Sequence, residues 1–308
     1  MTKTRRIGAL MAALAACSCT ADQEAPASAD ADFVSSPGDL VIGSWNLEYF
    51  GSPTMGVPDD ALQVANAATV IARLEPDVLG LEEIADASRF EELKRALPEY
   101  AGLTAVDPDV TGGAAAYPPL PAYYHPALLV KRDRAQIRSA KVVAGIDVGR
   151  PPLEAALTIA VGGQQIDLVV IVAHFYPFAE PAAWSRRRDT GDRLKAYLDT
   201  NHRDDMVAVI GDFNDDVDTS ILEGWPTPYA QLRDDSAHYL FTTQGLSVAG
   251  QGTTVDWPST IDHHLVTNEL AARFVSHSAW VERPPYIANY RNTTSDHYPV
   301  TTRYHLGP

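Results

Sequence analysis

Val207-Ala208-Val209-Ile210-Gly211-Asp212-Phe213-Asn214 is an apolar run that ends in an acid and an amide. Three other β-rich runs also deliver Asp, Asn, Glu or His at or near their ends: Ile42-Gly43-Ser44-Trp45-Asn46, Asp77-Val78-Leu79-Gly80-Leu81-Glu82-Glu83-Ile84 and Thr294-Ser295-Asp296-His297-Tyr298-Pro299-Val300. Apolar strands that bring hard oxygen ligands and imidazoles to one place are typical of a site for Mg²⁺ and phosphate.

Strands and helices alternate along the chain without an internal repeat. The pattern predicts strands over residues 40–46, 77–84, 127–131, 157–160, 165–173, 206–210, 261–267 and 297–304. Helices are expected from Asp59 or Asp60 to Pro76, from about Phe90 to Pro98 and over residues 181–199, with a long surface loop over 101–122. So many strands with so few helices favour an α/β fold, a four-layer sandwich of two packed, mainly antiparallel sheets with outer helices.

The composition describes a globular protein with a strongly acidic balance. The chain has 308 residues, is 45% hydrophobic and carries a net charge of −16. That charge disfavours a tight, non-catalytic DNA-binding role but allows an enzyme with a bound metal and a local basic strip. Arg186-Arg187-Arg188 fits either such a strip or a solvated helix face, and Trp184 and Tyr176 nearby fit either base stacking or packing.

The first residues predict export rather than a folded element. Residues 1–16 combine a basic start with a short apolar run, as a signal peptide does. Leu14-Ala15-Ala16-Cys17 resembles a bacterial lipobox, which predicts a lipid anchor on Cys17. Residues 17–38 are expected to form a flexible tether before a folded domain over 39–308. We therefore expect an exported, lipid-anchored protein in the outer membrane or at the cell surface or periplasm.

These segments resemble the endonuclease/exonuclease/phosphatase superfamily over about residues 39–305. The order of five motifs carries the resemblance, since Gly-Asp-Phe-Asn alone occurs by chance. The superfamily includes deoxyribonucleases, abasic-site endonucleases, sphingomyelinases and inositol-polyphosphate 5-phosphatases. The resemblance implies a catalytic domain over residues 39–308 that hydrolyses a phosphodiester with Mg²⁺, for which Mn²⁺ or Ca²⁺ can substitute or assist.

The metal ligands that the resemblance implies are Glu83, Asn46 and Asp296. Glu82 stands where the family more often has Gln. Because successive side chains of a strand point to opposite faces, only one of Glu82 and Glu83 is expected to face the site.

The resemblance also implies the catalytic set. Asp212 would orient or deprotonate the attacking water, and Asn214 would hold a phosphate oxygen. His297 would contact the scissile phosphate or act as general base, with Asp262 fixing its tautomer. His174 would stabilise the phosphate or protonate the leaving oxygen.

Three features depart from that pattern or compete with it. His125 stands where deoxyribonuclease-like members carry a Glu that supports His174. His263-His264 are interpreted as local structure, with a second metal site as the alternative. Five residues also fit the spacing of a calcium loop, although Val217 replaces the glycine that such a loop needs: Asp212, Asn214, Asp216, Asp218 and Glu223.

Within the superfamily, a nuclease acting on DNA or RNA is favoured. The segment Trp257-Pro258-Ser259-Thr260-Ile261-Asp262 lacks the Pro-Ala-Trp-Cys-Asp-Arg type of 5-phosphatases, and no membrane-inserting hairpin of the sphingomyelinase kind is evident. A phosphatase or a phospholipid phosphodiesterase is the alternative, and a catalytically inactive binding module or a calcium-binding structural protein are more distant ones. We expect a monomer whose partners are its nucleic-acid substrate and, through the anchor, a membrane.

Overall fold

The computed structural model describes residues 38–117 and 124–307. The predicted signal peptide, Cys17 and nearly all of the predicted tether lie outside the described residues. Within the described part, no helix is both long and apolar enough to cross a membrane.

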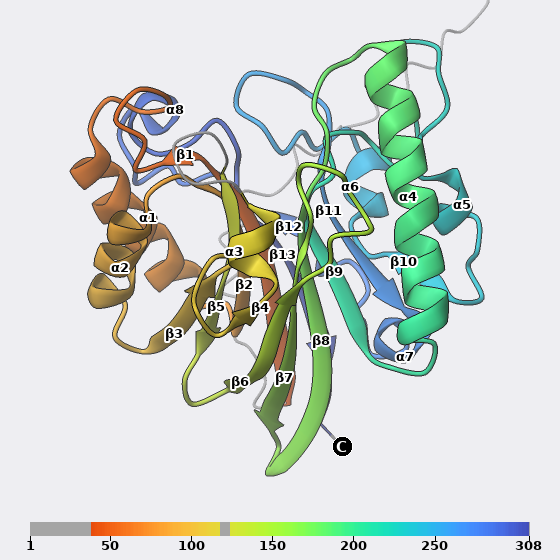
Figure 1. Ribbon diagram of the computed structural model, residues 1–308, viewed down its shortest axis with the longest axis horizontal. Coiled ribbons are helices and arrows are strands. Elements are labelled where there is room, and N and C mark those ends of the chain that lie inside the picture. The colour runs from red at the N-terminus through yellow and green to blue at the C-terminus, as the bar shows by residue number, and fades with distance from the viewer. Residues whose placement is uncertain (1–37, 118–123, 308) are drawn as a thin grey trace, which may run out of the picture. The chain divides into compact units, whose positions relative to one another are not determined.

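Two packed sheets form the centre of the fold (Figure 1). The first has six strands in the order β12-β13-β1-β2-β5-β3. Its neighbours are antiparallel except for β1 and β2, which run parallel. Its strands are β1 (Asp39–Phe50), β2 (Val78–Ile84), β3 (Tyr100–Thr104), β5 (His125–Lys131), β12 (Trp280–Val281) and β13 (Val300–His305).

The second sheet has seven strands in the order β10-β11-β9-β8-β7-β6-β4. Its parallel pairs are β8 with β9 and β4 with β6, and its other pairs are antiparallel. Its strands are β4 (Val110–Thr111), β6 (Ala135–Val142), β7 (Leu153–Val161), β8 (Gln164–His174), β9 (Val207–Asp212), β10 (Tyr239–Phe241) and β11 (Asp262–Thr267).

The main core lies between the sheets. Ile42 and Val78 from the first sheet share one buried cluster with Val172 and Ile210 from the second. The sheets approach closely at Gly80, where an added Cβ would lie 2.9 Å from Ile210 Cδ1. Each fully buried Val, Leu or Ile contributes about 1.5–3 kcal/mol, so this cluster is a main source of stability.

Helices cover the outer faces, with α1 and α2 on one side of the sheets in Figure 1 and α4 on the other. The helices are α1 (Asp60–Leu74), α2 (Ala87–Ala96), α3 (Gly113–Ala116), α4 (Pro181–Asn201), α5 (Ala230–Arg233), α6 (Gln244–Val248), α7 (Asn268–Ala271) and α8 (Tyr290–Thr293). The predicted start of the first helix is confirmed, because the Asp59 side chain accepts a hydrogen bond from the amide of Leu62. The predicted four-layer sandwich of mainly antiparallel sheets is likewise confirmed.

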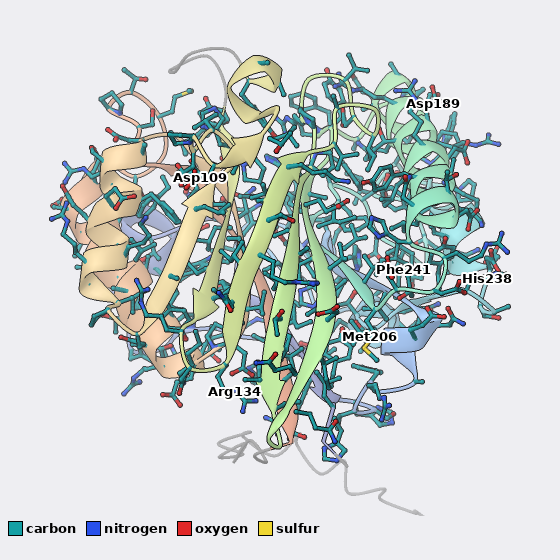
Figure 2. All side chains as sticks on the ribbon, turned by 60° about the horizontal axis from the view of Figure 1, so that its bottom comes forward. Asp109, Arg134, Asp189, Met206, His238 and Phe241 are labelled. Atoms are coloured by element: carbon teal, nitrogen blue, oxygen red, sulfur yellow. The ribbon has the colours of Figure 1, made fainter. Side chains whose placement is uncertain are left out.

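Arg134 (labelled in Figure 2) ties the two sheets together near the start of β2. It precedes β6, and its Nε donates to Asp77 Oδ1 at 3.0 Å, immediately before β2. This contact lies at the opposite end of β2 from Glu83, so it stabilises the scaffold without entering the site.

The prediction of a long loop over residues 101–122 is wrong for residues 101–117, the part that the structure describes. That part contains β3, β4 and α3. Gly102 packs so tightly on β5 that an added Cβ would lie 2.7 Å from the Leu128 carbonyl oxygen, so glycine permits a close strand contact here. The last strand begins at Val300 rather than at His297, which leaves His297 in the loop before it.

Candidate active site

Strand directions bring three predicted site residues to one edge of the seven-stranded sheet. His174 pairs with Asp212 across the parallel strands β8 and β9, so both strands end there. Asp262 starts the antiparallel strand β11 and also pairs with Asp212. All three side chains are buried.

The turn after β9 fixes the Asp212 carboxylate. Gly211 has φ of 132°, and an added Cβ would lie 2.1 Å from the Ala173 carbonyl oxygen, so glycine is needed for this approach. Asn214, at φ 54°, donates from its amide nitrogen to Asp212 Oδ1 at 2.8 Å and from Nδ2 to Oδ2 at 3.0 Å. Asn46 Nδ2 lies 3.1 Å from the same Oδ2. Asn46, Asp212 and Asn214 therefore form one hydrogen-bonded group.

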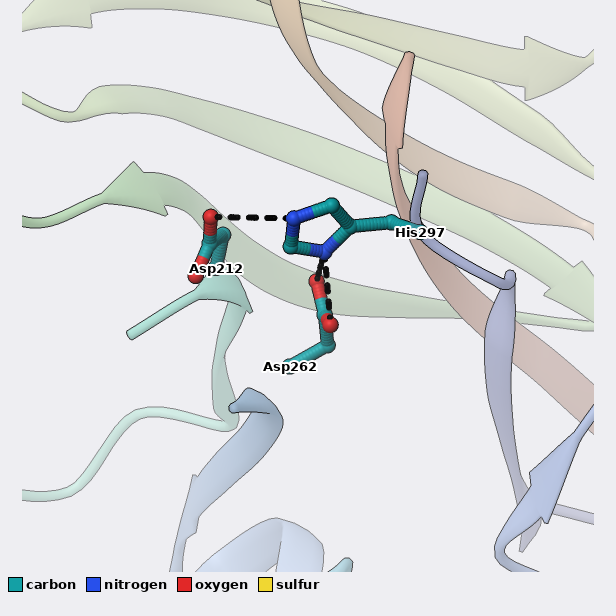
Figure 3. A group of neighbouring side chains, drawn as sticks. All are labelled: Asp212, Asp262 and His297. Atoms are coloured by element: carbon teal, nitrogen blue, oxygen red, sulfur yellow. Dashed lines mark hydrogen bonds and ion pairs between the residues drawn. The ribbon is translucent and has the colours of Figure 1, made fainter. Parts of the chain in front are cut away.

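His297 stands between two carboxylates (Figure 3). Its Nδ1 lies 2.9 Å from Asp262 Oδ2 and 3.1 Å from Oδ1, and its Nε2 lies 3.8 Å from Asp212 Oδ2. The carbonyl oxygen of His297 accepts hydrogen bonds from Trp45 Nε1 at 3.0 Å and from the Tyr290 hydroxyl at 2.6 Å. The backbone of His297 is thus fixed by Trp45 and Tyr290, and its ring by the two carboxylates.

Burial and mutual repulsion shift the pKa values of this group. Desolvation raises the pKa of Asp212, and the nearby Asp262 carboxylate raises it further while His297 opposes the shift. Burial alone would lower the pKa of His297, but the carboxylates of Asp262 and Asp212 outweigh it and hold that pKa well above its usual range. Shifts of this kind are typical of functional sites.

Asp212, Asp262 and His297 can hold a cation. Their ligand atoms all lie within 4.8 Å of one another. A second acidic group adjoins them. After burial, the Asp296 carboxylate raises the pKa of Glu48, and Glu83 raises it further. Burial first, and then Asp296, raises the pKa of Glu83. Hard oxygen donors that repel one another suit a divalent cation, so the residues present fit such a metal.

His174 lies between Asp212 and the second acidic group, which includes Glu83. Its Nε2 lies 3.6 Å from Glu83 Oε1 and 3.5 Å from Asp212 Oδ2. Arg150 Nη1 lies 2.6 Å from the same Nε2 and 3.1 Å from the Phe175 carbonyl oxygen. Since Arg can only donate, Nε2 accepts and the ring is neutral; burial and then Arg150 lower its pKa.

Arg150 and Glu48 are site residues that the sequence reasoning missed. Glu48 is held by Arg291, whose Nη1 lies 2.7 Å from Glu48 Oε2. The sequence signal for Arg150 is its place before Pro151-Pro152 and the strand β7, which runs antiparallel to the strand that carries His174. No comparable signal marks Glu48.

The regular strand alternation expected of Glu82 and Glu83 does not hold. Glu83 has φ of 63°, which breaks the strand alternation, and its Oε2 accepts a hydrogen bond from the amide of Tyr49 at 2.9 Å. Glu82 is fully buried between the sheets, and among the described residues neither carboxylate oxygen has a hydrogen-bond partner. Desolvation, then Asp262 and Asp212, raises its pKa well above the usual value.

The adjacent histidines of β11 take part in packing, as expected. His263 bonds to Thr243 Oγ1 at 2.9 Å, and His264 lies between Ser44 Oγ at 3.1 Å and Thr302 Oγ1 at 2.7 Å. His125 is buried against the Tyr117 ring, and its Nε2 has no partner among the described residues.

The three consecutive arginines of α4 do not form one basic strip. Arg187 is fully buried, and its Nη2 lies 2.7 Å from Asp215 Oδ2. Arg186 is paired with Asp147 at 2.8 Å. Trp184 is buried and donates to the Pro226 carbonyl oxygen, which indicates packing rather than base stacking.

The acids of the alternative calcium loop are engaged within the fold. Asp215, which lies within that spacing, accepts from Arg187 and from the amide of Ile221 at 2.7 Å. Asp216 accepts from the amides of Val217 at 2.7 Å and Thr260 at 3.2 Å. These bonds favour a structural turn.

Comparisons with solved structures agree with the sandwich. The human nocturnin catalytic domain with bound sulfate is 20% identical, with TM-score 0.61 over 88% of this chain and 95% of that one. D. rerio TDP2 complexed with single-strand DNA product is 16% identical, with TM-score 0.57 over 86% and 98%. A Bacteroides vulgatus endonuclease/exonuclease/phosphatase is 18% identical, with TM-score 0.59 over 86% and 98%. At these identities the likeness shows the fold.

The sequence itself matches no curated protein. The model of one protein family does match, over residues 43–297, which is most of the chain and includes every predicted site residue from Asn46 to His297. The chain belongs to the Endonuclease/Exonuclease/phosphatase family.

Proposed function

We propose that this chain is a Mg²⁺-dependent phosphodiesterase that hydrolyses DNA or RNA. The observation that carries the proposal is the contact of Asp212 with four other predicted site residues: Asn46, His174, Asn214 and His297. Four polar side chains around one buried carboxylate, with Asp262 behind His297, form a site for chemistry rather than for stability.

Glu83, Asp296 and Asn46 would hold the metal. When bound, Mg²⁺ supplies positive charge that neutralises the non-bridging and leaving oxygens of the phosphodiester. Glu48 stays beside these ligands, paired with Arg291, and adds negative charge to the metal position. Mn²⁺ or Ca²⁺ would fit the same oxygen donors.

Asp212 would orient and deprotonate the attacking water. Asn46 and Asn214 both donate to its Oδ2, which fixes the carboxylate in one orientation. Asp262 occupies Nδ1 of His297, so Nε2 is the nitrogen left to contact the scissile phosphate or the water. This is the arrangement in which an acid orients an imidazole.

His174 and Arg150 would hold the phosphate. The Arg150 guanidinium is a fork of donors that suits phosphate oxygens, and it meets His174 Nε2 at 2.6 Å. Because Nε2 accepts from Arg150, His174 would help to position the phosphate rather than protonate the leaving oxygen.

Nucleic acid is the substrate that the comparisons favour, since one similar structure holds a single-strand DNA product. We also propose export and lipidation at Cys17, because Leu14-Ala15-Ala16-Cys17 fits a lipobox after a basic and apolar start. Ser18 in the second mature position favours the outer membrane.

A substrate panel tests the proposed function. The purified protein is incubated with Mg²⁺ and single-stranded DNA, RNA, plasmid DNA, sphingomyelin, a phosphoinositide or bis(p-nitrophenyl) phosphate, with EDTA and Asp212→Ala as controls. We expect cleavage of nucleic acid that both controls abolish. Turnover of a lipid or phosphoinositide with intact DNA and RNA would refute the nuclease proposal, and full activity in EDTA would refute the metal-dependent site.

A further inference from the structure

Two exposed aromatic side chains lie on loops at either side of the catalytic carboxylate. β9, which ends at Asp212, lies between β8 and β11 in the sheet. β8 runs parallel to β9 and β11 runs antiparallel, so the loop after β8 and the loop before β11 leave the same edge. Phe178 is on the first loop, and Trp257 is on the second.

Trp257 is 72% exposed, yet its backbone is held firmly. Its amide donates to Thr254 Oγ1 at 3.1 Å, and that hydroxyl donates back to the Trp257 carbonyl oxygen at 3.0 Å. Thr254 forms an isolated antiparallel bridge with His297, and the amide of Val255 donates to the Asp296 carbonyl oxygen at 2.7 Å. The loop that carries the indole is thus bonded directly to the Asp296-His297 pair.

Phe178 is 61% exposed and is equally constrained. It follows His174 by four residues and has φ of 86°, which is rare for a bulky residue and indicates a conformation imposed by its surroundings. The buried Arg187 imposes it, because Nη1 donates to the carbonyl oxygens of both Tyr176 and Phe178 at 2.9 Å. Arg187 is in turn fixed by Asp215.

Such rings present a flat apolar face without the entropy cost of ordering a loop on binding. A phosphate is recognised by cationic groups and a metal ion by oxygen ligands, and an aromatic ring is neither. The two rings therefore serve another part of the substrate. Nucleobases have a π-face that aromatic side chains stack on, and in a duplex the neighbouring bases cover that face.

We propose that Phe178 and Trp257 stack on unpaired nucleobases that flank the scissile phosphodiester, so that the enzyme prefers single-stranded nucleic acid. The inference rests on the proposed function and specifies its substrate. Phe178 would contact a base on the His174 side, and Trp257 a base on the His297 side.

The test measures steady-state cleavage of a short single-stranded oligonucleotide, as DNA and as RNA, with Mg²⁺. Phe178→Leu and Trp257→Ala should each raise KM about tenfold or more with little change in kcat, as the loss of one stacked base does. Trp257→Phe, which keeps an aromatic face, should restore most of the affinity. Trp280→Ala removes another exposed tryptophan, on the edge strand β12, and should leave KM unchanged.

A second substrate separates stacking from a structural effect. In an oligonucleotide whose nucleotides on both sides of the cleavage site lack bases, neither ring has a base to stack on, so wild type and each variant should cleave it with the same raised KM. Equal KM for wild type and variants on the normal strand, an undiminished variant defect on the baseless strand, or equal cleavage of a blunt duplex would overturn the inference while leaving the nuclease proposal intact. Failure of wild type to cut any nucleic acid would overturn both.

Discussion

Asp262 faces His297 with both carboxylate oxygens, at 2.9 Å and 3.1 Å from Nδ1, and both side chains are buried. The contact makes Nδ1 the donor nitrogen and leaves Nε2 toward Asp212 at 3.8 Å. A buried imidazole whose Nδ1 donates in this way has a fixed ring plane, and whenever Nε2 is deprotonated it also has a fixed tautomer.

The first prediction concerns this contact. Asp262→Asn keeps the size of the side chain but removes the charge and allows the opposite tautomer. We expect kcat with Mg²⁺ to fall by about two to four orders of magnitude, as is typical when the acid behind a catalytic imidazole is neutralised. Circular dichroism should show an unchanged fold. Wild-type kcat in Asp262→Asn would remove the pair from the mechanism.

The second prediction concerns the metal. Glu83→Gln removes a hard anionic ligand, so the Mg²⁺ concentration for half-maximal activity should rise about 10- to 100-fold. Wild type should also gain thermal stability when Mg²⁺ is added without substrate, and the variant should gain less. Glu91→Gln, on the exposed face of α2, is the matched control. An identical Mg²⁺ response in Glu83→Gln would exclude Glu83 as a ligand.

The sequence predicts which strand ends carry the polar side chains of the candidate site, because apolar runs that end in Asp, Asn, Glu or His are local patterns. Asp212, Asp262 and His174 therefore come together once the strands pair. Alternation fails at Glu83, where a positive φ turns the backbone, and no periodicity signals such a residue.

Residues that act through long-range contacts are harder to predict. Arg187 looks like its exposed neighbour Arg188 in the sequence, but it meets an acid 28 residues away. Arg150 reaches His174 across 24 residues, from a loop whose sequence shows only prolines beside it. The sequence leaves Trp184 open between stacking and packing, and only the contact of its indole with the Pro226 carbonyl oxygen shows that it packs.

The third prediction concerns the buried pair of Arg187 and Asp215. Arg187→Met leaves a buried carboxylate without its partner, so the free energy of unfolding should fall by about 3–5 kcal/mol. In the double variant Arg187→Met/Asp215→Asn, the free energy of unfolding should fall by less than in Arg187→Met alone, because the unpaired buried charge is gone. Urea denaturation measures both, with Arg188→Met as the exposed control. A double variant less stable than the single one would contradict this account.

The fourth prediction concerns the N-terminus. If Cys17 is lipidated, the mature chain begins there and fractionates with membranes in the native host. Cys17→Ser should give either a soluble chain or an uncleaved signal peptide, whereas Cys19→Ser should change neither. Intact mass spectrometry decides, since an unmodified Cys17 in the mature protein would rule out the anchor.

The last prediction concerns Glu82, which is buried between the sheets without a hydrogen-bond partner among the described residues. Because its folded pKa is raised, the folded state keeps a proton that the unfolded chain releases above about pH 4.5. The folded state is thus favoured fully below that pH and loses stability as pH rises toward the folded pKa, by about 1.4 kcal/mol per pH unit. Glu82→Gln is isosteric and cannot ionise. Its free energy of unfolding should therefore equal that of wild type near pH 4 and exceed it increasingly toward neutral pH. Denaturation in EDTA across this pH range measures the difference in stability between Glu82→Gln and wild type. The contributions of the other buried acids are common to both proteins and cancel in this difference. A stability difference that does not change with pH would show that Glu82 is ionised in the folded protein.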